Sequence, residues 1–85
     1  MREKVRLRQY VMTLHAEEEM DEDGLTVYDV ECGILSGVIV QRQQDASTSE
    51  RKYCVRGSSL EGDPIEIVAK LGPIGDMVII TVYRR

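Results

Sequence analysis

The spacing of the apolar residues changes once along the chain, and this change limits the folds that the chain can form. The apolar residues of the segment that ends at Gly37 follow the 3.6-residue period of a helix, whereas those from Val38 onward alternate with the two-residue period of strands. Helices followed by a run of neighbouring strands predict an α+β domain of two layers, with the helices on one face of an antiparallel sheet. Because 85 residues hold one core, we expect a single domain over residues 1–85.

The amino-terminal part of the chain predicts one strand and two short helices. Leu7–Thr13 is compatible with a strand, and Thr13 can then cap a helix whose inward side is formed by Ala16 and Met20. A variant of the capping box, Thr26 with an acid three residues later, begins the second helix. Glycines suited to ending these helices follow at Gly24 and Gly37.

Three or four further strands are predicted in the rest of the chain. The segments "VIVQR", "RKYCVRG", "PIEIVAK" and "DMVIITVYR" are separated by a polar hairpin loop and by turns rich in glycine and proline. The last segment, Met77–Tyr83, is apolar on both faces, which favours a place in the middle of the sheet. With the helices on one face, the other face is left for a ligand or a partner.

The charge of the chain is unevenly distributed. The net charge is −4, from 11 basic and 15 acidic residues, which argues mildly against non-specific binding to nucleic acid or anionic lipid. Eight of the acids, and no base, lie in residues 17–31, so the strand region is free to form a basic face. We interpret the run from Glu17 to Asp23 as a solvated helix face, with a partner's basic surface as the alternative use.

The two cysteines limit the cofactors that the protein can hold, and the lengths of its apolar runs limit where it can be located. Cys32 and Cys54 match no paired metal spacing, and one histidine cannot complete a zinc site, so we expect no metal and no cofactor. A reduced, intracellular chain is the simpler interpretation. No apolar run reaches the roughly 18 residues of a membrane span, and the charged start lacks the apolar core of a signal peptide. We therefore expect a cytoplasmic protein that does not enter a membrane.

Several short motifs, taken in order, resemble one family. "YVMTLHAEEEMDEDGLTVYDVECGILSGVIV" is followed by "KYCVRG", "DPIEIVAKLG" and "VIITVYR". Over nearly its whole length the chain resembles the bacterial and archaeal family known as domain of unknown function 4258, through His15, Ala16, Met20, the stretch from Gly24 to Val30, Thr81, Val82 and Tyr83. The family pattern is similar to that of the RelE/ParE and BrnT type toxins, which implies a RelE-like arrangement of the predicted elements.

The resemblance also implies a function, by analogy of fold. Toxins of these types cut messenger RNA or otherwise poison the cell, and members of the family are often encoded beside a small zinc-finger antitoxin. A toxin-like protein of a toxin and antitoxin pair is implied, with RelE-type cleavage of messenger RNA as its activity and with an antitoxin, RNA or the ribosome as partners. Many members have arginine at the positions of Glu19 and Asp23, so no arginine role is carried over to those two residues.

Two other functions stay open beside the toxin. The first is a non-catalytic protein-interaction or regulatory module that has the fold without RNA cleavage. The second is a homo-oligomer formed through edge strands or through the open sheet face, which would be a structural property without information about function.

A ribonuclease of this kind needs a base for the 2′-OH, cations at the scissile phosphate and an acid for the leaving oxygen. The candidates are His15, Arg56, Lys70 and Tyr83. Histidine is the side chain that exchanges protons near neutral pH, and His15 is the only one, although it can equally fix the corner between a strand and a helix. Arg56 and Lys70, on successive strands, could approach one phosphate or be solvated charges.

Tyr83 has two interpretations that depend on the face it occupies. By strict alternation, Thr81 and Tyr83 share a face of the last strand with Met77 and Ile79. Tyr83 is then either the polar tip of a core residue or a group that stacks on a base and donates a proton. The catalytic hypothesis requires all four candidate side chains to converge in one cleft.

Overall fold

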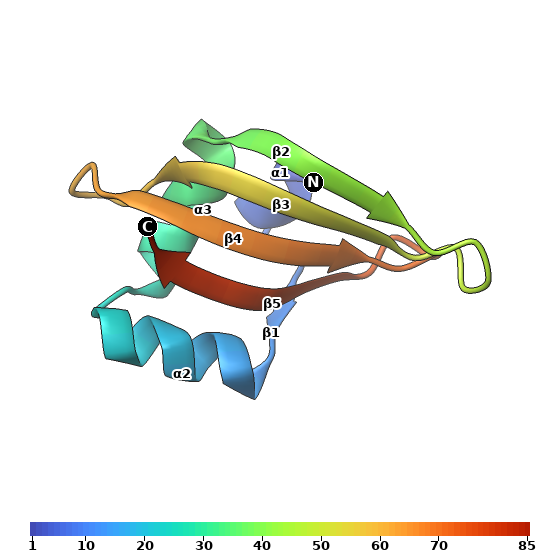
Figure 1. Cartoon of the computed structure of the whole chain (residues 1–85), viewed down its shortest axis with the longest axis horizontal. Coiled ribbons are helices and arrows are strands. Elements are labelled where there is room, and N and C mark those ends of the chain that lie inside the picture. Colours follow the sequence, from blue (N-terminus) through green and yellow to red (C-terminus); the bar gives the residue numbers. More distant parts are fainter.

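The computed structural model describes residues 1–85 as three helices and one five-stranded sheet (Figure 1). The elements are α1 (Arg2–Arg6), β1 (Val11–Met12), α2 (Leu14–Asp23), α3 (Val27–Ser36), β2 (Val38–Gln44), β3 (Arg51–Ser58), β4 (Pro64–Leu71) and β5 (Met77–Arg84). The strand order is β1-β5-β4-β3-β2, in which only β1 and β5 are parallel. The predicted α+β class is confirmed, and the sheet is mixed rather than wholly antiparallel.

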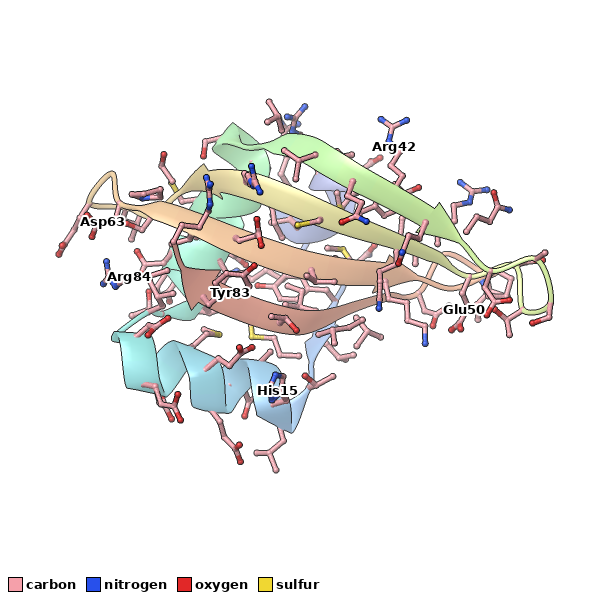
Figure 2. All side chains as sticks on the ribbon, viewed as in Figure 1. His15, Arg42, Glu50, Asp63, Tyr83 and Arg84 are labelled. Atoms are coloured by element: carbon pink, nitrogen blue, oxygen red, sulfur yellow. The ribbon has the colours of Figure 1, made fainter.

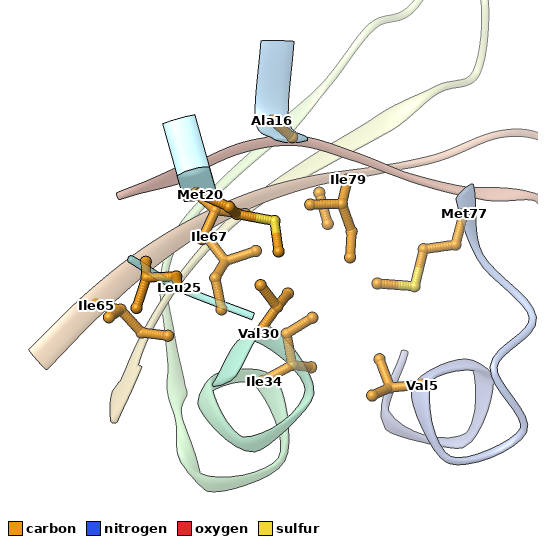
Figure 3. Packing of buried hydrophobic residues seen from close by; sticks show 12 residues of the cluster. Val5, Ala16, Met20, Leu25, Val30, Ile34, Ile65, Ile67, Met77 and Ile79 are labelled. Carbon is orange, nitrogen blue, oxygen red and sulfur yellow. The ribbon is translucent and has the colours of Figure 1, made fainter. Parts of the chain in front are cut away.

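The helices leave one face of the sheet uncovered. α1 and α3 lie behind the sheet in the view of Figure 1, and α2 runs along its β5 side. The core between these layers contains residues from all three helices, from the connection between α2 and α3 and from strands β4 and β5 (Figure 3). Its twelve members are Val5, Ala16, Met20, Leu25, Val30, Ile34, Ile65, Ile67, Ala69, Met77, Ile79 and Val82.

The strand predicted at Leu7–Thr13 is wrong for most of its length, because only Val11 and Met12 pair with β5. Ahead of them the chain forms α1, which places Val5 in the core with 1% of its surface exposed. A turn follows in which Arg8 has a positive φ of 55°. The positive φ of Arg8 is incompatible with an extended strand, so the strand can begin only after this turn.

The predicted helix ends are confirmed in detail. The Thr13 hydroxyl accepts a hydrogen bond from the N–H of Ala16 at 3.1 Å, and Gly24 ends α2 in the left-handed conformation with φ of 68°. Thr26 and Asp29 form a complete capping box at the start of α3. These ends depend on neighbours in sequence, which is why the sequence predicts them.

A β-bulge in β5 overturns the predicted alternation of its side chains. Val68 of β4 pairs with Thr81 and Ala69 pairs with Ile79, so one residue of β5 is left without a partner between them. The extra residue turns Val82 into the core, where it is fully buried, and puts Tyr83 on the opposite face. The assignment of Tyr83 to the face of Met77 and Ile79 was therefore wrong.

The acidic side of α2 has a structural role that the charge pattern did not predict. β1 covers β5 only at two residues, and beyond it α2 supplies side-chain acceptors to the free edge. Glu19 accepts a hydrogen bond from the N–H of Val82 at 3.2 Å, and Asp23 accepts one from the N–H of Arg84 at 2.9 Å. The run from Glu17 to Asp23 is thus a solvated face only in part, since these two acids seal a sheet edge.

Candidate functional site

The sheet face opposite the helices, called the open face below, carries most of the polar chemistry of the strands. Val55, Ile67 and Val82 are paired across β3, β4 and β5 and are buried against the helices, so the residues that alternate with them point away. The open face consists of three rows that cross β2, β3, β4 and β5, namely Val38, Arg56, Glu66 and Tyr83; Gln41, Cys54, Val68 and Thr81; and Gln43, Lys52, Lys70 and Val78.

The first row holds an ion pair beside Tyr83. Arg56 donates a hydrogen bond from Nε to Oε1 of Glu66 at 2.8 Å, and the Glu66 side chain is only 11% exposed whereas that of Arg56 is 48% exposed. Tyr83 is the direct neighbour of Glu66 on β5. The half-exposed guanidinium therefore keeps donors free for a ligand while it neutralises a carboxylate beneath the surface.

The third row places two lysines directly opposite each other. Lys52 and Lys70 are register partners on β3 and β4, an arrangement in which like charges destabilise the sheet. Glu50 offsets this repulsion from the rim, with its Oε2 3.0 Å from Nζ of Lys70. Lys52 has no such carboxylate partner. An anion placed between the two ammonium groups would therefore find one cation unpaired and a second only partly neutralised.

Two shallow hollows lie on this side of the molecule. A hollow of about 300 Å³ is lined by Gln41, Gln43, Lys52, Cys54, Glu66, Val68 and Tyr83. A larger one of about 630 Å³ extends to the β2–β3 hairpin and is lined by Gln43, Gln44, Asp45, Glu50, Arg51, Lys52, Lys70 and Ile80. Lys52 belongs to both hollows, so a ligand that spans them would pass over this residue.

Cys54 lies in the middle of the open face but is not an activated thiol. Burial raises its pKa, and the nearby Glu66 carboxylate raises it further. The cysteine is therefore the protonated thiol at neutral pH, which is a weak nucleophile. Cys32 and Cys54 are both free, and they form no disulfide.

The structure brings three of the four predicted site residues to one face and leaves the fourth beyond its rim. Figure 2 shows Tyr83 on the sheet and His15 on α2. Arg56, Lys70 and Tyr83 point from β3, β4 and β5 onto the open face. His15 lies in the first turn of α2, beyond the edge of β5, and its side chain is 65% exposed. Its ring contacts Glu19 of the same helix at 3.3 Å and makes no polar contact with the other three.

Two residues of the open face were missed by the sequence analysis. Glu66 is the centre of the first row, and Lys52 is the unpaired cation of the third. Both were visible in principle, because Glu66 alternates with buried isoleucines in "PIEIVAK" and Lys52 alternates with Tyr53 and Val55 in "RKYCVRG". What the sequence lacked was the register that places these residues next to Tyr83 and Lys70.

The chain contains no group of three or more His, Cys, Asp or Glu side chains placed to hold a metal ion. Its longest helices have ten residues, and none has the length and apolar character of a membrane crossing.

Comparison with known proteins bears on the region that builds this face. A family model, described as domain of unknown function (DUF4258), matches residues 12–84. The chain belongs to this family. The match includes every residue of the open face and leaves out helix α1. No curated protein and no solved structure matches the chain.

Proposed function

We propose that this member of the DUF4258 family is a toxin-like protein that binds single-stranded RNA on its open face. The observation that supports the proposal is the presence of Lys52, Arg56 and Lys70 with Tyr83 on one sheet face that no helix covers. Cations that are only partly paired attract phosphates, and an aromatic ring on the same face offers a surface for an unpaired base. The net charge of −4 does not oppose this, because eight of the fifteen acids lie in residues 17–31, outside the strands that form that face.

The spacing of the rows fits an extended strand of RNA. The lysine row and the row of Arg56 and Tyr83 are separated by four residues along β4, from Lys70 to Glu66, which corresponds to roughly 13 Å at 3.3 Å per residue. RNA that lies along the strands would place one phosphate over Lys52 and Lys70 and another near Arg56. A base would then stack on Tyr83, and stacking of this kind requires an unpaired nucleotide.

The proposed activity is RelE-type cleavage of messenger RNA. In this proposal Arg56 binds the scissile phosphate beside Tyr83, and Lys70 binds a neighbouring phosphate over the lysine row. Tyr83 donates a proton to the leaving oxygen, and His15 acts as the base from beyond the β5 edge. The ring of His15 contacts Glu19 rather than the open face. The proposed partners are an antitoxin of the zinc-finger type and RNA, free or on the ribosome.

Binding and cleavage are tested separately. Fluorescence anisotropy with a 12-nucleotide single-stranded RNA should give a dissociation constant that rises with salt, and Lys52→Ala should reduce the slope of log K against log[salt] by about 0.7. Arg6→Ala, which removes an exposed cation on α1, is the matched control and should leave the slope unchanged. RNA affinity that is equal in wild type and Lys52→Ala would contradict the proposal.

For cleavage, induced expression should arrest growth, and Tyr83→Phe should abolish the arrest while the variant stays folded by circular dichroism. His15→Ala tests the base in the same assay. Normal growth and intact RNA under strong induction would remove the endoribonuclease activity from the proposal.

The second candidate function is a non-catalytic interaction module. The ion pairs of Arg56 with Glu66 and of Lys70 with Glu50 favour it, because a cation that is already paired is less available to a phosphate. The position of His15 outside the open face favours it as well. This candidate predicts no RNA cleavage and normal growth on induction, for the wild type and for Tyr83→Phe alike.

A further inference from the structure

The two edges of the sheet are protected very differently. The edge of β5 is covered by β1, by the Thr13 hydroxyl, which donates to the carbonyl oxygen of Ile80 at 3.1 Å, and by the two carboxylates of α2. β2, at the other edge, pairs only with β3, and all seven of its residues are exposed. A strand in this position presents a row of N–H and C=O groups that no other strand satisfies.

The β2 edge, defined as Val38–Gln44, also lacks most of the features that block strand addition. It contains no proline, no acidic residue and only one cation, Arg42. Its single irregularity is a bulge at Val40, which has no partner on β3. Three consecutive apolar side chains are exposed along it, with 63%, 38% and 44% of their surface accessible at Val38, Ile39 and Val40. An apolar edge of this length is a template for another strand.

A groove on the helix side of this edge would receive part of an added strand. It has a volume of about 480 Å³ and is lined by Met1, Arg2, Ile34, Gly37, Val38, Ile39, Arg42 and Val55. Its apolar floor comes from the start of α1, the end of α3 and the inward residues of β2. Its charged groups are Arg2 and Arg42, and no carboxylate lines it. A strand placed beside β2 would therefore direct alternate side chains towards a cationic and apolar groove.

We infer that the β2 edge binds an extended, acidic segment of another protein by strand addition. Backbone hydrogen bonds to β2 would supply the affinity, and acidic side chains facing Arg2 and Arg42 would supply the selectivity. A second copy of the chain fits this edge less well, because antiparallel pairing of two β2 strands about Gln41 brings the two copies of Arg42 close together. The inference is independent of RNA binding, since the cations and the aromatic ring proposed to bind RNA lie on β3, β4 and β5 and none of them belongs to the β2 edge.

The test uses the full chain and a nine-residue probe peptide of alternating Glu and Val with blocked ends. In ¹⁵N-labelled protein the probe should shift the backbone amides of Val38–Gln44 and leave those of the β5 edge unchanged. Arg42→Glu should weaken the dissociation constant about tenfold, as expected for reversal of an interfacial charge. The matched control is Arg85→Glu, at the exposed carboxyl terminus, which should bind as the wild type does.

A second comparison isolates the backbone contribution. Val40→Pro removes the N–H of the bulge residue. Because Val40 has no register partner on β3, the β2–β3 pairing should survive while strand addition is blocked. Val40→Thr keeps the N–H and should bind normally. If that proline variant does not fold, a probe that is N-methylated at alternate residues replaces it, and this probe should bind at least about tenfold more weakly.

Three outcomes would overturn the inference. The first is the absence of amide shifts in Val38–Gln44 at millimolar probe. The second is equal binding of a probe in which Lys replaces Glu, which would show that the edge does not select acidic side chains. The third is a dimer in sedimentation that Val40→Pro dissociates, since a second copy would then be the occupant of the edge.

Discussion

The carboxylate of Glu19 accepts a hydrogen bond from the backbone N–H of Val82 at 3.2 Å, so a helix side chain takes the place of a neighbouring strand. Asp23 does the same for Arg84 one turn later. The pair explains how α2, with only Ala16 and Met20 buried in the core, is held against β5. It also leaves β2, which pairs only with β3, as the one long strand at an edge of the sheet.

Removal of the edge acceptor should destabilise the protein modestly. Glu19→Ala leaves the N–H of buried Val82 without a partner, and we expect the free energy of unfolding to fall by about 1 kcal/mol. Hydrogen exchange at the Val82 amide should accelerate in the same variant. Glu18→Ala, on the solvated side of α2, is the control and should change stability by less than about 0.5 kcal/mol. Equal effects of the two variants would mean that Glu19 does not seal the edge.

The ion pair on the open face should behave as a coupled unit. Arg56→Met leaves the Glu66 carboxylate, which is 11% exposed, without its cation, and should lower the free energy of unfolding by about 1 to 2 kcal/mol. The double variant Arg56→Met/Glu66→Gln should lose less than the sum of the single variants, because no unpaired charge is left in it. Urea denaturation of the four proteins measures the coupling. Strict additivity would contradict a shared interaction.

The capping box predicts one part of the pH dependence of stability. Hydrogen bonds from the N–H of Thr26 and then of Leu60 lower the pKa of Asp29 below its ordinary value of 3.8. A carboxylate whose pKa is lowered by folding stabilises the protein fully above that value, and the contribution is lost as the pH falls through the lower pKa of the folded state.

Asp29→Asn should therefore be less stable than the wild type at pH 7, by about 1 kcal/mol, and the difference should shrink as the pH falls below 3.8. Thermal denaturation between pH 7 and pH 2 provides the measurement. Glu22→Gln, at an exposed position of α2, serves as the control, and its stability should change with pH as that of the wild type does. A difference that stays constant with pH would show that the charge of Asp29 is not involved.

Close contact between α3 and β3 depends on glycine at position 57. A Cβ there would overlap the carbonyl oxygen of Gly33, which is backbone and cannot turn aside. Gly57→Ala should lower the free energy of unfolding by about 2 kcal/mol or more, since the helix must move away from the sheet. Ser58→Ala on the same strand is the control, expected within about 0.5 kcal/mol of the wild type. A stable Gly57→Ala protein would indicate that α3 shifts at little cost.

The features that the sequence predicted correctly are local. Thr13, Gly24 and the capping box at Thr26 act on residues within four positions of themselves, so their chemistry marks the helix ends without knowledge of the fold. The β-compatible segments after Val38, separated by turn residues, located β2 to β5 for a similar reason, because strand propensity and turn chemistry act within a few residues.

The features that the sequence analysis missed or misplaced depend on contacts between distant segments. Helix α1 exists because Val5 finds a place in the core, and the face of Tyr83 was decided by one extra residue in β5. Glu19 seals an edge more than sixty residues away, which no charge pattern reveals. The candidate site follows the same rule, since Lys52 and Lys70 become neighbours only through the register of β3 and β4.

By itself the sequence determined the α+β class, the ends of α2 and α3 and the four carboxyl-terminal strands, because periodicity and capping act within a few residues. Only the tertiary structure decided that Arg56, Lys70 and Tyr83 share an uncovered face while His15 lies beyond its rim. The physical reason is that strand register, bulges and edge contacts are set by packing between segments, and packing energy is not contained in any one of them.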